Sequence, residues 1–570
     1  MEPRRLILAV FLMAAVLLLS NVLFPTAKPS PAALKATADS IKLADSVKRA
    51  IAVGAVAAMP AAAQAGGVAS MANVPDSIAA KSAKIAAVDT TSTQTERVIF
   101  RTTNRGAALI GAQMRDYKAL ENKSRVKGDP VELARAGDRL IGFRFVSPKG
   151  DTVRLDQATF RTTQSEANGN KIVKYDATVG EWPVSIEYSF RPDSYRVNVA
   201  MKVEGAPSGF VLMDLPPGFH SSEADTTEDA NHLAYALKHE NKNPEGVTFR
   251  SLDPGEHNVK PGPITWVVAK NKYFLVGVLT PVGAPGFSQL DVTGGVRATK
   301  QATRAQATIV TPIKSGAAAF DMYVGPQEFK RLVAVGREFE TSNPYGGWLQ
   351  GIVQPFATMV IRVLLWMKAT LGLGYGWILI LFGVTIRIIL WPLNQKAMRS
   401  SMAMQRIQPE MTAIQAKYKG DPQRLQTEMM KLYKEHNMSP FSSLSGCLPM
   451  LIPLPVFFAL FFVFQNTIEF RGVPFLWLPD ISIKDPFFVL PIAVAITAMG
   501  LSWIGMKGMK ANEQQKIMMY MMPAMMLLFF FNMASGLNLY YLVQNLASLP
   551  QQWLIAHERS KNAATPLVRG

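Results

Sequence analysis

The chain has 570 residues, of which 49% are hydrophobic and 18% are charged, and its formal net charge is +18. The single cysteine, Cys447, excludes a disulfide framework and a multi-cysteine metal site, and the 6 histidines form no closely spaced metal motif. Residues 346–570 hold 19 Lys and Arg against 9 Asp and Glu, spread over loops between apolar runs, which fits a membrane domain better than nucleic-acid binding.

An apolar run over residues 6–24 follows Arg4 and Arg5. It is long enough for a membrane helix and lacks an Ala-x-Ala cleavage signal at its end, so we expect residues 1–24 to form an uncleaved signal anchor. Residues 25–95 are rich in Ala, Ser, Pro and Lys and poor in aromatic residues. This composition predicts a flexible linker.

Short alternating runs begin near residue 96. From Tyr195 to Glu204, apolar and polar side chains alternate with a period of two, which is typical of a strand with one buried face. Similar runs cover residues 98–103, 140–146, 184–190 and 264–279, and segments containing Gly, Pro or Asn separate them. The pattern predicts a β-sandwich domain over residues 96–340.

In residues 346–370, Arg362 and Lys368 interrupt an apolar sequence, which favours an amphipathic helix at the membrane surface over a span. Apolar runs long enough to cross a membrane follow at 374–393, 446–466, 487–504, 517–533 and 536–555. We therefore expect a polytopic α-helical membrane protein with six transmembrane helices. Its five-helix core would cover residues 371–557, and a tail would cover residues 558–570.

Loop charges predict the orientation of these helices. Residues 394–438 carry 8 Lys and Arg against 4 acidic residues, whereas residues 467–486 carry 2 basic against 3 acidic residues. Residues 505–516 are basic as well. The positive-inside rule then places both termini in the cytoplasm of an inner-membrane protein and the β-domain in the periplasm.

Arg387 lies within the first of these five apolar runs. A permanent charge at that depth costs about 2.5–17 kcal/mol, so it needs an anionic partner or water. Gly376 and Gly383 lie within about 40° of Arg387 on a helix of 100° per residue. Small residues there either leave room for water or a passing chain, or let a neighbouring helix approach closely.

The last apolar run carries a polar stripe. Its members fall within about an 80° arc: Asn538, Tyr541, Asn545, Ser548 and Gln552. The stripe either lines a wet cavity with Arg387 or forms hydrogen bonds between helices. Because no Asp or Glu lies at membrane depth, a wet cavity is favoured over a buried ion pair around Arg387.

The segment 395–438 is predicted to be a cytoplasmic helical hairpin. A Lys-Gly-Asp-Pro sequence breaks it, with Asp421 as the N-cap and Pro422 at the first position of the second helix. The hairpin is either a solvated structure resting on the membrane or a docking platform for a partner. We take the docking residues to be Gln408, Pro409, Lys417, Asp421 and Pro422.

At several of these places the chain resembles the YidC family of membrane protein insertases. The matching segments are Thr385–Leu393, Gln408-Pro409, Gly446–Ile452, Pro455–Phe457, Asp485-Pro486, Gln514–Ile517 and Ser535–Tyr541, with weaker matches at Asn104–Gly106 and Gly325-Pro326. The chain departs from the family pattern at Pro453, where a glutamine is usual, and it has extra residues over 441–445.

This resemblance implies a five-helix insertase core that encloses a hydrophilic groove open to the cytoplasm and to lipid. Arg387 matches the groove arginine of the family, and Tyr541 matches a tyrosine implicated in substrate contact. Together with the helical-phase argument, we expect Gly383, Asn538 and Asn545 to line the same groove.

The predicted function is therefore insertion and folding of nascent membrane proteins in the lipid bilayer, without enzymatic activity or cofactor. Expected partners are the Sec translocon and, at the cytoplasmic face, the ribosome or targeting machinery, without sequence-specific nucleic-acid recognition. A small-solute transporter is the chief rival, but the repeated broken helices of that class are not seen. A membrane-anchored enzyme lacks a catalytic motif here, and a structural anchor would need no groove arginine.

Overall fold

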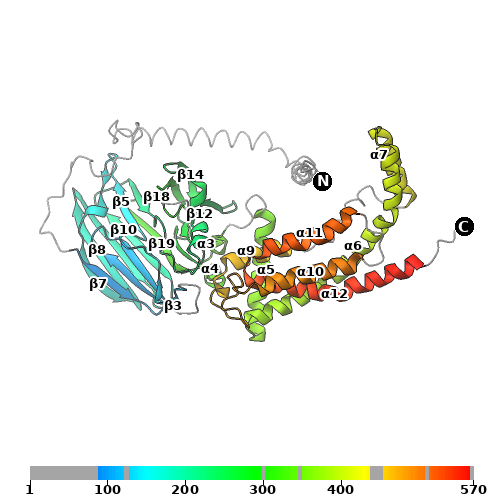
Figure 1. The fold of residues 1–570 in the computed structure, drawn as a ribbon. Helices are drawn as coiled ribbons and strands as arrows, with labels where there is room; N and C mark the ends of the chain where they lie inside the picture. The colour runs from blue at the N-terminus through cyan, green and yellow to red at the C-terminus, as the bar shows by residue number, and fades with distance from the viewer. Residues whose placement is uncertain are drawn as a thin grey trace.

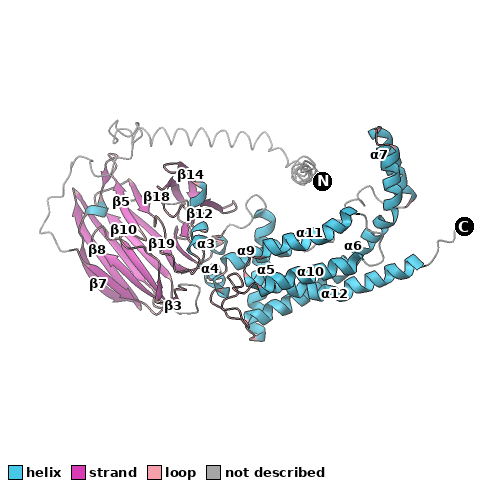
Figure 2. Cartoon of the chain, in the orientation of Figure 1, coloured by secondary structure: helices cyan, strands magenta, loops and turns pink. Residues whose placement is uncertain are grey.

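The computed structural model describes residues 88–120, 128–297, 302–343, 350–436, 454–506 and 513–564. The strands gather at one end of the molecule, and the long helices extend from that end in one direction (Figures 1 and 2). The predicted signal anchor, Cys447, Pro453 and most of the predicted linker lie outside the described residues.

The β-domain contains three antiparallel sheets. A four-stranded sheet joins β1 (Thr90–Gln94), β2 (Val98–Thr103), β3 (Leu109–Lys118) and β4 (Pro130–Glu132). A six-stranded sheet has the order β14 (His257–Ile264), β17 (Phe287–Gly294), β18 (Ala305–Pro312), β11 (Phe210–Asp214), β5 (Gly142–Val146) and β6 (Thr152–Val153). A nine-stranded sheet has the order β13 (Glu245–Thr248), β12 (Ala234–Lys238), β15 (Trp266–Lys270), β16 (Phe274–Leu279), β19 (Ala317–Pro326), β10 (Arg196–Val203), β9 (Trp182–Phe190), β8 (Asn170–Val179) and β7 (Arg161–Ala167).

One hydrophobic core connects the three sheets, with side chains from each of them in the same buried cluster. Strand β10 has the predicted alternation: Val197, Val199 and Val203 are buried, whereas Ala200 and Lys202 are exposed. Alternate side chains of one strand point to opposite faces, so this sheet packs one face on the core. The mainly β architecture predicted for this part of the chain is confirmed.

Two local predictions in the β-domain were wrong. The run 264–279 is not one strand but the hairpin β15–β16, because the Asn271 side chain accepts hydrogen bonds from the backbone N–H groups of Tyr273 and Phe274 and turns the chain. Strand β1 lies inside the predicted linker. Its polar sequence concealed an edge strand that pairs with β2 and buries alternate residues.

Short helices complete this domain: α3 (Thr226–Asn231), α4 (Phe329–Val335), η2 (Leu155–Gln157), η3 (Phe249–Ser251) and η4 (Phe339–Thr341). The Asp225 carboxylate accepts the Glu228 N–H and caps α3. The segment that carries η4 covers the outer face of β15 and β16, where Phe339 packs against Trp266 and lies close to Gly277. This cover explains why both faces of the two strands are buried.

The rest of the described chain is helical. Its elements are α5 (Gln350–Leu371), α6 (Tyr375–Lys417), α7 (Pro422–Glu435), α9 (Leu454–Asn466), η7 (Ile468–Phe470), α10 (Val489–Met506), α11 (Glu513–Phe530) and α12 (Ser535–Ala564). Helix α12 packs against both α6 and α10, α11 packs against α10, and α5 packs against α9 and α6. Their apolar side chains form a second buried cluster.

Two helical segments of the described chain are long and apolar enough to cross a membrane, Tyr375–Gln395 and Val489–Met506. Shorter apolar helices cover Val456–Asn466 and Tyr520–Phe530. The helical architecture agrees with the prediction, and the number of six membrane-spanning helices stays a prediction. The predicted surface helix corresponds to α5, which is not one of the two segments.

Helix α6 is continuous over 43 residues, so the predicted span and the first arm of the hairpin are one helix. The hairpin itself is confirmed. The Asp421 carboxylate accepts the Arg424 N–H at 3.0 Å and caps α7, with Pro422 at its start. Helix α7 lies at the end of the molecule farthest from the β-domain (Figure 1).

Candidate functional site

Arg387 lies on α6, is half-buried, and faces α12. Its Nη2 donates a hydrogen bond of 2.6 Å to Gln551 Oε1, and Gln551 Nε2 donates to the Trp391 carbonyl at 3.0 Å. Within the described residues no carboxylate forms an ion pair with Arg387, and its buried Nε has no hydrogen-bond partner there. The guanidinium therefore keeps its full charge and has donors to spare.

Further polar contacts continue along the same two helices. Gln544 Nε2 donates to the Gly383 carbonyl at 2.8 Å and also lies 3.1 Å from the Tyr540 hydroxyl. Tyr540, Gln544 and Gln551 are spaced by four and seven residues, which places them within about 40° on α12. We call these three residues, Arg387 and Gly383 the polar seam. It adds a line of polar groups to an otherwise apolar interface between α6 and α12.

The predicted stripe on α12 does not meet Arg387. Asn538 is fully buried and donates to the Phe530 carbonyl, and the Tyr541 ring packs against Phe530 at 4.8 Å. Asn545 donates to the Val494 carbonyl and to Thr497 Oγ1 on α10. These residues face α10 and α11 because α12 lies between α6 and α10, so its two polar faces have different neighbours. Their hydrogen bonds correspond to the interhelical alternative.

The two glycines on the Arg387 face accommodate neighbouring side chains. A Cβ at Gly376 would lie 2.1 Å from Phe475 Cδ2, and one at Gly383 would lie 3.0 Å from Val543 Cγ1. Close approach of neighbours is thus the observed use of both positions. The carbonyl of Gly383 contributes to the polar seam through Gln544.

The predicted docking residues lie on the α6–α7 hairpin. Lys417 and Pro422 are exposed beside the turn, and Gln408 and Pro409 fall within α6. A small apolar cluster holds the two arms together: Ile407, Leu432 and Tyr433. The hairpin therefore presents its turn, with Asp421 half-exposed at the cap, away from the helix bundle.

A buried arginine that the sequence did not reveal joins the β-domain to the helices. Arg471, in the loop between α9 and α10, has a side chain only 5% exposed and pairs with Glu223, whose side chain is 10% exposed. Arg471 Nε lies 2.8 Å from Glu223 Oε1, and Nη2 donates to the Lys118 and Ser222 carbonyls. Every one of these acceptors belongs to the β-domain.

Two further contacts support the same junction. The Tyr273 hydroxyl donates to Ser482 Oγ at 3.2 Å, and Glu469 Oε1 accepts the Phe329 N–H at 2.9 Å. Burial raises the pKa of Glu223 to about 7, against the opposing effect of Arg471, and burial also raises the pKa of Glu469 to about 7. We call the contacts of Arg471, Tyr273 and Glu469 the domain junction. The loop between α9 and α10 is thus fixed to the β-domain.

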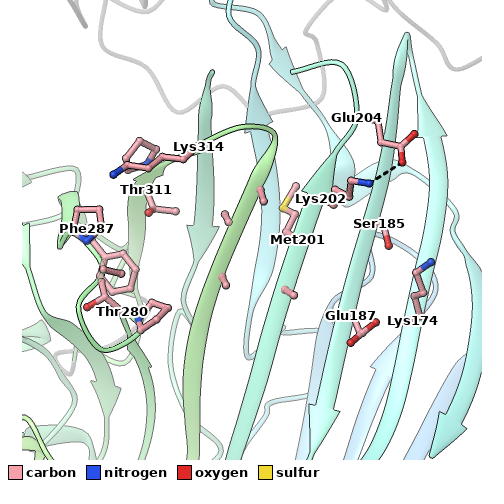
Figure 3. Close-up of a pocket in the computed structure, with 18 of the residues that line it drawn as sticks. Lys174, Ser185, Glu187, Met201, Lys202, Glu204, Thr280, Phe287, Thr311 and Lys314 are labelled. Atoms are coloured by element: carbon pink, nitrogen blue, oxygen red, sulfur yellow. Dashed lines mark hydrogen bonds and ion pairs between the residues drawn. The ribbon is translucent and has the colours of Figure 1, made fainter. Parts of the chain in front are cut away.

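A hollow of about 640 Å³ lies on the outer face of the nine-stranded sheet (Figure 3). Alanines form part of its floor, and its charges balance, with Lys174, Lys202 and Lys314 against Asp176, Glu187 and Glu204. Lys202 and Glu204 form an ion pair at 3.2 Å. Balanced charge and small apolar side chains indicate no particular class of ligand.

Comparison with known proteins covers both parts of the chain. Residues 91–359 match the family model described as YidC periplasmic domain, and residues 366–562 match the one described as 60Kd inner membrane protein. Membrane protein insertase YidC of Chlorobaculum tepidum is 30% identical over 495 residues, which covers 80% of this chain and 81% of that protein. The protein of the same name from Chlorobium phaeovibrioides is 34% identical over 401 residues, covering 65% and 66%.

Among solved structures, an active YidC insertase with its first transmembrane domain resolved is 18% identical, with a TM-score of 0.34, and covers 82% of this chain and 93% of that one. The family assignment rests on the sequence matches, which span the β-domain and the helices together. The chain belongs to the YidC family of membrane protein insertases.

Proposed function

We propose that this chain inserts newly made membrane proteins into the inner membrane, with its β-domain in the periplasm and both termini in the cytoplasm. Its relatives are named membrane protein insertases, and the family descriptions refer to an inner membrane protein and a periplasmic domain. The basic segment 394–438 supports a cytoplasmic hairpin. In that orientation α7 and the β-domain occupy opposite sides of the membrane, consistent with their positions at opposite ends of the molecule.

The observation that carries the proposal is the position of Arg387 in an apolar helix, where no carboxylate of the described residues forms an ion pair with it. Moving a polar segment through hydrocarbon is costly because its groups lose water without gaining hydrogen bonds. A guanidinium with free donors, next to Gln544 and Gln551, offers such a segment polar contacts inside the membrane. The positive charge of Arg387, which has no carboxylate partner within the described residues, favours acidic tails in particular.

In this mechanism the hydrophobic part of the substrate stays in contact with lipid, while its short polar tail enters a hydrophilic groove bordered by the polar seam. Asn538, Tyr541 and Asn545 would form the other wall of the groove, toward α10 and α11. For these residues to reach a substrate, α12 must separate from its closed packing against α10 and α11. The sequence contains no phosphate-binding loop of the G-x-x-x-x-G-K-[ST] type, so we propose insertion without nucleotide hydrolysis.

The hairpin is the proposed docking site for the ribosome or targeting machinery. Its segment 394–438 has an excess of basic residues, 8 against 4, and Lys417 and Pro422 are exposed at the turn. Positive charge suits an anionic partner surface such as ribosomal RNA. We further propose that the chain works alone or together with the Sec translocon.

Depletion of the chain tests the proposed function. Inverted vesicles from depleted cells should fail to protect the translocated tail of a short-tailed test protein from protease, and adding back the full chain should restore protection. Restoration by the added chain distinguishes a direct role in insertion from indirect effects of depletion on the vesicles. Normal insertion in depleted vesicles would contradict the proposal.

A further inference from the structure

A second hollow, of about 610 Å³, lies in the β-domain at the sheet formed by β1–β4. Its lining differs from that of the balanced hollow in Figure 3, because arginines dominate its charged groups. Four arginines line it, from β2, from the turn after β2 and from the loop after β4: Arg101, Arg105, Arg135 and Arg139. The acidic residues in the lining are Glu132 and Asp138.

Both acidic residues are already committed to other partners. Glu132 pairs with Arg101 and also accepts the Ala112 and Ala134 N–H groups. Asp138 forms a bidentate pair of 2.7 and 3.0 Å with Arg304, which is not part of the lining. Neither carboxylate forms an ion pair with the remaining three arginines within the described residues, although the charge of Asp138 acts on Arg135.

Two of those three arginines are held in place by backbone carbonyls. Arg135 Nε donates to the Phe219 carbonyl at 2.7 Å, and Arg139 Nη2 donates to the Asp156 carbonyl at 3.2 Å. The Asp156 carboxylate forms its ion pair with Arg154. Within the described residues, Arg105 forms no ion pair, and its side chain is exposed at the rim.

Like charges held close together raise the free energy of the folded protein unless an anion binds between them. The pKa of Arg135 is lowered, first by burial and second by the nearby Arg304, while the charges of Asp138 and Asp229 act in the opposite direction. The arginine fork is geometrically suited to phosphate and carboxylate oxygens. Three guanidiniums have more N–H donors and more positive charge than one carboxylate can match. A phosphate has more acceptor oxygens and carries up to two negative charges.

We propose that this hollow, the arginine pocket, binds a soluble phosphate-bearing solute in the periplasm, with Arg105, Arg135 and Arg139 as its ligands. Thr90 and His220 supply further polar groups in the lining. The pocket is built from the β-domain alone and shares no residue with the polar seam. The site therefore stands independently of the proposed insertion mechanism.

The test is calorimetric titration of the full chain, in nanodiscs of zwitterionic lipid, with orthophosphate. Saturable binding is expected, weakening as ionic strength rises. Arg105→Ala and Arg135→Ala should each weaken it by roughly tenfold or more, the loss of a charge-assisted contact. Arg161→Ala is the matched control. It removes the same charge, and Arg161 is exposed on β7, outside the pocket. It should leave binding unchanged.

A variant that is expected to bind phosphate more tightly separates a specific effect from misfolding, because a misfolded protein would lose binding. Asp138→Asn releases Arg304 and should tighten phosphate binding by about two- to fivefold. Parallel titrations use a glutamate-rich peptide and phosphatidylglycerol vesicles in place of orthophosphate. The proposal is overturned if orthophosphate does not bind saturably, if Arg161→Ala weakens binding as much as Arg135→Ala, or if only the peptide or the vesicles bind.

Discussion

Arg387 and Arg471 are both removed from bulk water, but they have different partners. Arg471 joins two parts of the chain and meets a carboxylate, two backbone carbonyls and two aromatic rings in the β-domain. Arg387 meets one amide oxygen, and its Nε stays without a hydrogen-bond partner in the described structure. A cation paired with a carboxylate and with backbone carbonyls fixes a structure, whereas a cation with a buried donor to spare can bind a substrate.

Removing Arg471 should have the largest effect on stability among these predictions. Arg471→Ala leaves Glu223 buried without its cation, which typically costs about 3–5 kcal/mol. We expect loop 467–486 to lose protection in hydrogen exchange and the β-domain to detach from it. Lys484→Ala, an exposed position of the same loop, is the control. Unchanged protection in Arg471→Ala would show that the domain junction does not depend on this pair.

Placing a carboxylate beside Arg387 is the converse experiment. Gln551→Glu is nearly isosteric and places a negative charge about where the Gln551 amide oxygen now lies, 2.6 Å from Arg387 Nη2. Insertion of acidic-tailed substrates should fall by roughly tenfold, equivalent to about 1.4 kcal/mol. The control is Gln552→Glu, which adds the same charge on the side of α12 that faces Gly505.

Equal losses in Gln551→Glu and Gln552→Glu would mean that any added negative charge on α12 slows insertion. The specific claim about Arg387 would then fail. Normal insertion in both variants would contradict a role for the charge of Arg387 altogether.

The domain junction should also respond to pH. The pKa of Glu223 and of Glu469 is raised from 4.5 to about 7, so the docked state binds more protons than a separated, solvated state between those values. Docking is therefore favoured at low pH and weakens as pH rises through about 7. Hydrogen exchange of loop 467–486, corrected for intrinsic rates, should be slower at pH 5.5 than at pH 8. The double variant Glu223→Gln and Glu469→Gln should lose most of this difference, and an unchanged difference would assign it to other groups.

Local patterns predicted much of this molecule. The alternation in β10 and the Asp421–Pro422 helix start depend on neighbours in sequence, and both are confirmed. The partner of Arg387 was missed because α12 has two polar faces, and only packing decides which one meets α6. Arg471 and Glu223 are 248 residues apart, and no periodicity links them. Charge placement at depth was predictable, whereas the partner of each charge was not.

Paired substrates that differ only in the charge of their translocated tail give the most direct test of Arg387. Arg387→Ala should slow insertion of the acidic-tailed member about three- to fivefold more than that of the neutral member, which corresponds to roughly 1 kcal/mol or less of charge interaction in a hydrated groove. Arg387→Lys should keep most of this preference because it keeps the charge. Equal slowing of both substrates by Arg387→Ala would contradict the view that its uncompensated charge receives acidic tails.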